Sequence, residues 1–118
     1  MNRQEFSDYV DYVKQRTSKV LQNKGNEYSY NNGAFENFEE GVAIGLSETR
    51  EAVAWGYVTK QIQSVRAMIK ALEEGTAKDS DFTPEFIDEK FGDVINYMIL
   101  IEAMFKERCN KSKQKEFL

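Results

Sequence analysis

The sequence predicts an all-α protein, a single antiparallel bundle of about four helices over residues 1–118. Apolar residues recur at steps of three and four along most of the chain, which is the pattern of helices with one buried face. The chain has one proline, and most of its seven glycines fall between these periodic segments. A chain of 118 residues also fits one domain and is long enough to bury one core.

Two helices are expected in the first half of the chain, over about residues 3–22 and 34–44. Their apolar residues recur every three or four positions, and Gly45 is expected to end the second helix. Residues 23–33 between them are rich in Asn and Gly, which predicts a loop. The apolar positions are Phe6, Val10, Val13, Val20 and Leu21 in the first helix and Phe35, Phe38 and Val42 in the second.

Two long helices are expected in the second half, antiparallel and joined by residues 75–82. The third helix would begin after an N-cap at Ser47 and stop at Gly75. The fourth would have Thr83 as N-cap and Pro84 at its first position. Their facing apolar seams are Trp55, Val58, Ile62, Val65, Ile69 and Leu72 on one helix and Ile87, Phe91, Val94, Met98, Ile101 and Phe105 on the other.

Self-association is expected from the lengths of these two helices. Each would be about 40 Å long at 1.5 Å per residue, whereas a compact domain of this size has a radius of gyration near 13–14 Å. The fourth helix also carries Ile95 and Ile99 away from its seam. Both points favour an elongated homo-oligomer, and the alternative is a monomer whose first helix covers that second side. Residues 109–118 are predicted to be a frayed basic tail.

Several functions are excluded by composition. The chain has no histidine and one cysteine, Cys109, which excludes a Ser-His-Asp triad, a zinc site with histidine and an intrachain disulfide. With 20 acidic and 16 basic residues, binding to a nucleic acid polymer is not expected. Because no signal peptide or membrane-spanning segment is found, no membrane partner is expected and the protein is predicted to be cytoplasmic.

Carboxylates and amides gather on two of the predicted helices. Two carboxylates four residues apart on one face repel each other mildly, and a divalent cation between them would reverse that effect. Oxygen ligands of this kind suit Mg²⁺, especially when it also binds substrate phosphates. Solvated acidic faces would give the same pattern. The residues are Glu36, Glu39 and Glu40 on the second helix and Glu89, Asp93 and Asn96 on the fourth.

Aromatic and cationic residues suggest a ligand that is planar and anionic. Tyr28 and Tyr30 lie in the predicted loop, where they could stack on a planar ligand or simply pin the loop to the bundle. On the third helix, Lys60 lies well off the seam and Arg66 lies at its edge. A guanidinium near a core needs an anion or an acidic partner, and a salt bridge from Arg66 to Glu102 would serve equally well.

Three segments, in this order, carry a family resemblance. They are Lys-Gly-Asn-Glu-Tyr-Ser at 24–29, Phe-Glu-Asn-Phe at 35–38 and Glu-Lys-Phe-Gly-Asp-Val-Ile-Asn-Tyr at 89–97. The set resembles small phage and prophage proteins of the MazG-like, all-α nucleotide pyrophosphohydrolase type. That resemblance implies an oligomeric helical bundle with an acidic magnesium site for nucleoside triphosphates.

The match to the family's metal motif is partial. A later helix of the family carries E-x-x-D, whereas Lys90 stands three residues before Asp93 here and Glu89 stands four before it. Glu48 and Glu51 are rival candidates for the early acidic set.

The leading hypothesis is a protein that binds a phosphorylated nucleotide, linear or cyclic. In its enzymatic form, Glu89 and Asp93 would be catalytic and would hold Mg²⁺ together with Glu36, Glu39 and Glu40. A second hypothesis is a non-catalytic sponge that sequesters a cyclic nucleotide signal of bacterial anti-phage immunity, and a third is a helical interaction module. The ligand-binding candidates are Lys24, Glu27, Tyr28, Tyr30, Asn37, Lys60, Arg66 and Asn96.

Overall fold

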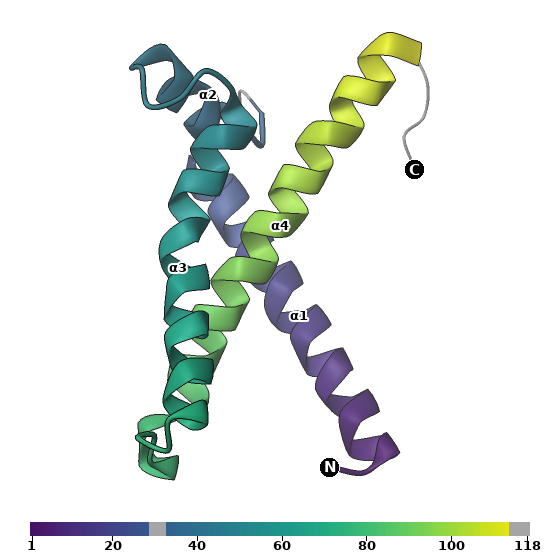
Figure 1. The fold of residues 1–118 in the computed structure, drawn as a ribbon. Coiled ribbons are helices and arrows are strands. Elements are labelled where there is room, and N and C mark those ends of the chain that lie inside the picture. Colours follow the sequence, from purple (N-terminus) through teal and green to yellow (C-terminus); the bar gives the residue numbers. More distant parts are fainter. Residues whose placement is uncertain (29–32, 114–118) are drawn as a thin grey trace.

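The structure, a computed structural model, describes residues 1–28 and 33–113, with side chains over 1–23 and 33–110. All regular structure in these ranges is helical, which confirms the predicted class (Figure 1). No helix within them combines the length and the apolar content needed to span a bilayer. The elements are α1 (Arg3–Tyr28), α2 (Glu36–Ala43), α3 (Arg50–Glu73), the short 3-10 helix η1 (Asp79–Asp81) and α4 (Pro84–Lys113).

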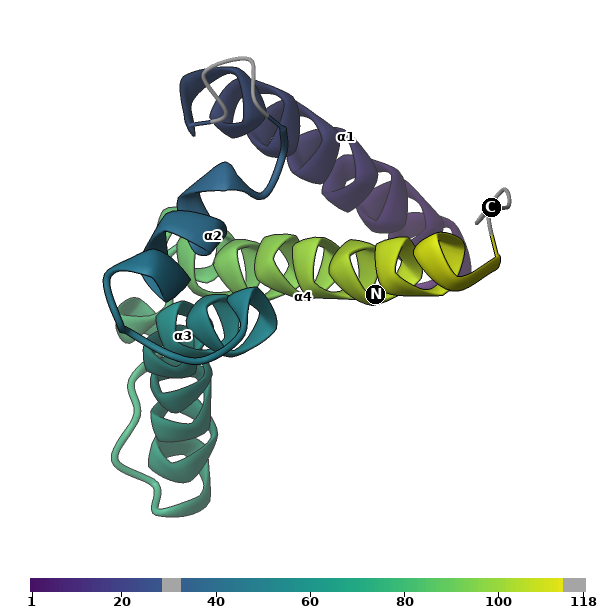
Figure 2. The same cartoon turned by 90° about the horizontal axis from the view of Figure 1, so that it is seen from above.

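The core lies where α2, α3 and α4 meet. Phe38 of α2 packs there with Val53 and Ala54 of α3 and with Ile101 and Met104 of α4. The antiparallel pairing of α3 and α4 is as predicted. Figure 2 shows α2 near the start of α3, on the side that faces α1.

Helix α1 crosses α4 and is held there by polar contacts (Figure 1). Nη1 of Arg16 lies 2.9 Å from Oδ1 of Asp88, and the hydroxyl of Tyr12 donates to the same carboxylate. A Cβ at Gly92 would lie 3.5 Å from Nε of Arg16. That distance is an ordinary van der Waals contact, so the arginine side chain lies directly against α4 at this position.

Two of the predicted helix ends are confirmed. Oγ1 of Thr83 accepts a hydrogen bond from the amide of Phe86 at 3.1 Å, so Thr83 caps α4. Gly75 has a φ of 70° just past the end of α3, a conformation that glycine adopts without the steric cost a Cβ would add.

Three other boundaries were wrong. Helix α1 continues to Tyr28, so residues 23–28 are helical rather than loop. Extending an existing helix needs no new nucleus, which offsets the poor helix propensity of Gly and Asn. Thr49 rather than Ser47 caps α3, since its Oγ1 accepts from the amide of Ala52. Helix α4 continues through residues 109–113 of the predicted tail, and residues 114–118 lie outside the described ranges.

Only part of the predicted seams is buried. Val58 and Ile101 are buried, but Trp55, Ile69 and Phe105 are each more than half exposed. The C-terminal part of α3, which includes position 69, points away from the axis of α4 (Figure 2). The radius of gyration is 17.1 Å, compared with about 13.5 Å for a compact chain of this length.

Candidate functional site

One face of α4 carries Glu89, Asp93 and Asn96 as predicted. Glu89 is exposed, Asp93 is half-buried and Asn96 is buried, with 7 % of its surface exposed. Oδ1 of Asn96 has no hydrogen-bond partner among the described residues. A buried polar atom without a partner costs about 1–3 kcal/mol. A ligand that donates a hydrogen bond to this oxygen would remove that cost.

A second buried group without a partner lies one turn away. The side chain of Arg16 is 12 % exposed and pairs with Asp88 through Nη1. Its Nε has no acceptor in the described part of the chain, and it lies against Gly92. Gly92 precedes Asn96 by four residues, which is about one helical turn. A donor and an acceptor, both buried, therefore lie on adjacent turns where α1 crosses α4.

Glu39 of α2 is held in an ion pair with the start of α3. Oε1 of Glu39 accepts a hydrogen bond from Nη1 of Arg50 at 3.0 Å. The same guanidinium lies 3.0 Å from Oε1 of Glu107. Glu36 is half-buried and Glu40 is exposed. Glu39 therefore has a structural role, since it neutralises a buried arginine.

Glu51, the rival candidate for the early acidic set, is also paired. Nη2 of Arg108 donates to Oε1 of Glu51 at 2.7 Å, and Nε donates to the other oxygen. These hydrogen bonds hold the pKa of the Glu51 carboxyl below its ordinary value of 4.5. Glu48, the other rival, is exposed.

The donor set expected for magnesium is not assembled within one chain. Over residues 1–28 and 33–113, no three carboxylate or thiol side chains lie close enough to hold a metal ion. Nζ of Lys90 lies 3.7 Å from Oε1 of Glu89, so a cation already lies beside this carboxylate. The described side chains therefore do not fit a single-chain magnesium site.

The other predicted ligand residues fall into two sets, one that is exposed and one whose side chains are not described. Asn37, Lys60 and Arg66 are exposed, so the prediction that Arg66 lies near the core was wrong. No ion pair joins it to Glu102 among the described residues. Lys24, Glu27 and Tyr28 lie in the last turns of α1, where side chains are not described. Tyr30 lies outside the described ranges.

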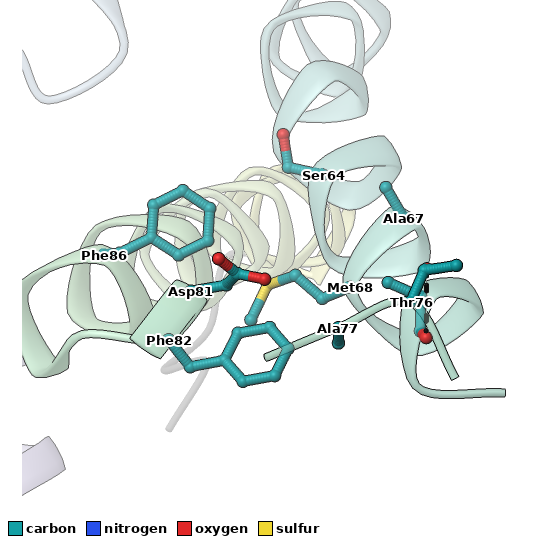
Figure 3. A pocket seen from close by; sticks show the side chains of 9 residues that line it. Ser64, Ala67, Met68, Thr76, Ala77, Asp81, Phe82 and Phe86 are labelled. Carbon is teal, nitrogen blue, oxygen red and sulfur yellow. Dashed lines mark hydrogen bonds between the residues drawn. The ribbon is translucent and has the colours of Figure 1, made fainter. Parts of the chain in front are cut away.

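A pocket of about 320 Å³ opens between α3, the connection and the start of α4 (Figure 3). Met68, Phe82 and Phe86 form apolar walls, and Asp81 supplies a carboxylate. None of the predicted site residues lines it. A carboxylate without a lining cation repels phosphate, so this pocket does not suit a nucleotide.

Sequence reasoning missed the two buried arginines. Arg16 lies between Val13 and Val20 on the apolar face of α1, at the three- and four-residue spacing that was used to define that face. A charged residue on an otherwise apolar face could have indicated this buried arginine. Arg50 likewise precedes the buried Val53 and Ala54 by three and four residues.

Comparison of the chain with protein-family models, with curated proteins and with solved structures finds no match in any of the three.

Proposed function

We propose that this chain is a MazG-like protein that binds a phosphorylated nucleotide where α1 crosses α4. The observation that carries the proposal is the pair of buried, unpartnered atoms Oδ1 of Asn96 and Nε of Arg16. Oδ1 needs a donor, which the exocyclic amino group of a base supplies. Nε needs an acceptor, which a phosphate oxygen supplies as a charge-assisted hydrogen bond. A nucleotide offers both groups in one molecule.

The ion pairs of the acidic residues favour a protein that binds the nucleotide and does not hydrolyse it. Glu39 is paired with Arg50, and Glu51 is paired with Arg108. A carboxylate that is already neutralised by a guanidinium competes poorly for Mg²⁺. A sponge for a linear or cyclic nucleotide, acting as a homo-oligomer in the bacterial cytoplasm, is consistent with these pairs.

The test is a panel of nucleoside triphosphates and cyclic dinucleotides, incubated with the intact protein with and without Mg²⁺. We expect one ligand to be recovered unchanged after the protein is denatured, with chromatography as the readout. Release of pyrophosphate that disappears in Asp93→Ala would instead support the pyrophosphohydrolase. No retention and no turnover across the panel would overturn nucleotide binding.

The Asn96→Leu variant tests the site. Because it replaces a buried polar group that has no protein partner with an apolar one, the folded state should keep its stability or gain some. Loss of a hydrogen bond to the ligand should weaken binding at least about tenfold. Gln63→Leu, on the exposed surface of α3, is the matched control and should bind normally. Normal affinity of Asn96→Leu would remove Asn96 from the site.

A further inference from the structure

The pocket between α3, the connection (residues 74–83) and the start of α4 is separate from the nucleotide site proposed above (Figure 3). Its volume is about 320 Å³, at the low end of the range of about 300–1,000 Å³ in which small-molecule sites fall. The space therefore suits a ligand the size of one ring with a short chain.

Small side chains leave this space open, and the backbone holds it in shape. Ala67 and Ala71 line the pocket from one side of α3, four residues apart, and Ala77 lines it from the connection. The amides of Thr76 and Ala77 donate to the carbonyl of Ala71 at 3.0 and 3.2 Å. The pocket is thus formed before any ligand binds, which lowers the entropic cost of binding.

Aromatic rings form two of the walls. Phe82 and Phe86 are both half-buried and line the pocket together with Met68. The face of an aromatic ring carries partial negative charge, so it attracts a cation as well as an apolar group. Nζ of Lys90, which does not line the pocket, lies 5.5 Å from the centroid of the Phe86 ring. Among the described side chains, no cation lies over the ring of Phe82.

Asp81 carries the charge of this pocket. Figure 3 shows its carboxylate among the Phe82 ring, the Phe86 ring and the thioether of Met68. Oδ2 of Asp81 accepts a hydrogen bond from the amide of Lys78 at 2.9 Å, which fixes the position of the carboxylate. In the described part of the chain, no lysine or arginine forms an ion pair with Asp81. Its negative charge is therefore available to a ligand.

We propose that this pocket binds a small organic cation, an ammonium group on an apolar body of about one ring. The ammonium group lies against the Asp81 carboxylate and the face of Phe82. The apolar body packs on Met68 and Phe86. A carboxylate without a counter-ion selects a cation over an anion, and apolar walls select an organic cation over a hydrated metal ion. The inference concerns a second site and does not depend on nucleotide binding.

The first test compares four probes on the intact, isotope-labelled protein at pH 7 and low salt, with amide chemical shifts as the readout. 2-Phenylethylamine, a cation at this pH, should bind with a Kd on the order of 1 mM, as expected for so small a ligand. 2-Phenylethanol and 3-phenylpropanoate keep the ring and the chain but lack the positive charge, and should bind at least about fivefold more weakly. Methylammonium, which has the charge without the ring, should bind more weakly by at least the same factor.

Two results of this comparison would overturn the proposal. One is equal affinity for the amine and the alcohol, because the charge would then play no part. The other is the absence of amide shifts with the amine at about 10 mM, well above the expected Kd.

The second test removes the charge and keeps the shape. Asp81→Asn retains an oxygen that accepts from the amide of Lys78, so the connection should stay folded. It should weaken binding of 2-phenylethylamine at least about fivefold and leave that of 2-phenylethanol unchanged. Asp79→Asn is the matched control, because Asp79 is exposed in the same 3-10 helix and does not line the pocket. Natural affinity of Asp81→Asn for the amine would show that the proposal is wrong.

The third test locates the bound amine. The amides of Thr76, Ala77 and Phe82 should shift most, and those around Asn96 should not shift. Asn96→Leu, which is expected to weaken nucleotide binding, should bind the amine normally, because Asn96 does not line the pocket. Failure of one site is thus distinguishable from failure of the other. Largest shifts around Asn96 would assign the amine to the nucleotide site and contradict the proposal.

Discussion

Arg50 and Glu39 form an ion pair with 3.0 Å between Nη1 and Oε1, and the arginine is 9 % exposed. The guanidinium also donates to the carbonyl of Met104 at 3.4 Å and lies 4.9 Å from the ring centroid of Phe35. Glu107 completes its surroundings at 3.0 Å. One side chain at the start of α3 thus ties α2 and α4 to the core.

Replacing this arginine should loosen the whole α2–α3–α4 junction. Arg50→Ala removes two charge-assisted hydrogen bonds and the packing on Phe35, and we expect the free energy of unfolding to fall by about 3 kcal/mol. The carboxylates left behind are partly exposed, so water can solvate them. Urea unfolding measures the change. Lys70→Ala, which removes an exposed pair with Glu74, should cost less than about 0.5 kcal/mol, and equal losses in the two variants would contradict this role.

Acid should weaken the contact between Glu51 and Arg108. Because hydrogen bonds from Arg108 lower the pKa of Glu51 in the folded state, its carboxylate stabilises the fold above the ordinary pKa of 4.5. That contribution is lost as the pH falls through the lowered value. Glu51→Gln should therefore be less stable than the natural chain at pH 7, and the difference should shrink below about pH 4. Urea unfolding across this range measures it, with exposed Glu48→Gln as the control that should show no such trend.

Helix positions could be predicted from the sequence because they depend on local patterns. Thr83 caps α4 and Gly75 ends α3 as predicted, since both signals act within a few residues. The extension of α1 to Tyr28 could not be read in this way, because cooperative propagation outweighed local propensity there.

The candidate site could be predicted only in part, because sequence patterns report the structure of one helix and not the contacts between helices. Periodicity placed Glu89, Asp93 and Asn96 on one face of α4, which depends on one helix alone. It could not show that Glu39 faces Arg50, because that contact depends on how α2 meets α3. The burial of the two seams was also predicted wrongly in part. Spacing shows which side of a helix is apolar, but it does not show whether another helix covers that side.

Two glycines inside helices should respond in opposite ways to alanine. At Gly41, an added Cβ would lie 2.6 Å from Cγ1 of Val53, which is buried, so Gly41→Ala should cost about 1–3 kcal/mol through overpacking. At Gly56, no atom lies within 4 Å of an added Cβ. Gly56→Ala should stabilise α3 by about 0.5–1 kcal/mol, because alanine loses less backbone entropy in a helix. Thermal unfolding of both variants checks the signs, and a stabilising Gly41→Ala would contradict the packing of α2 on α3.

The docking of α1 on α4 should depend on Asp88. Arg16 and Tyr12 both donate to this carboxylate, and Arg16 is largely buried, so Asp88→Ala leaves a buried guanidinium without its anion. We expect α1 to separate from α4 more often, while the core around Met104 stays closed. Hydrogen exchange should then become at least about tenfold faster across the middle of α1, corresponding to about 1.4 kcal/mol or more. Amides near Met104 should keep their protection. Exposed Asp11→Ala should leave both regions unchanged, and uniform loss of protection in Asp88→Ala would show instead that α1 and the core unfold as one unit.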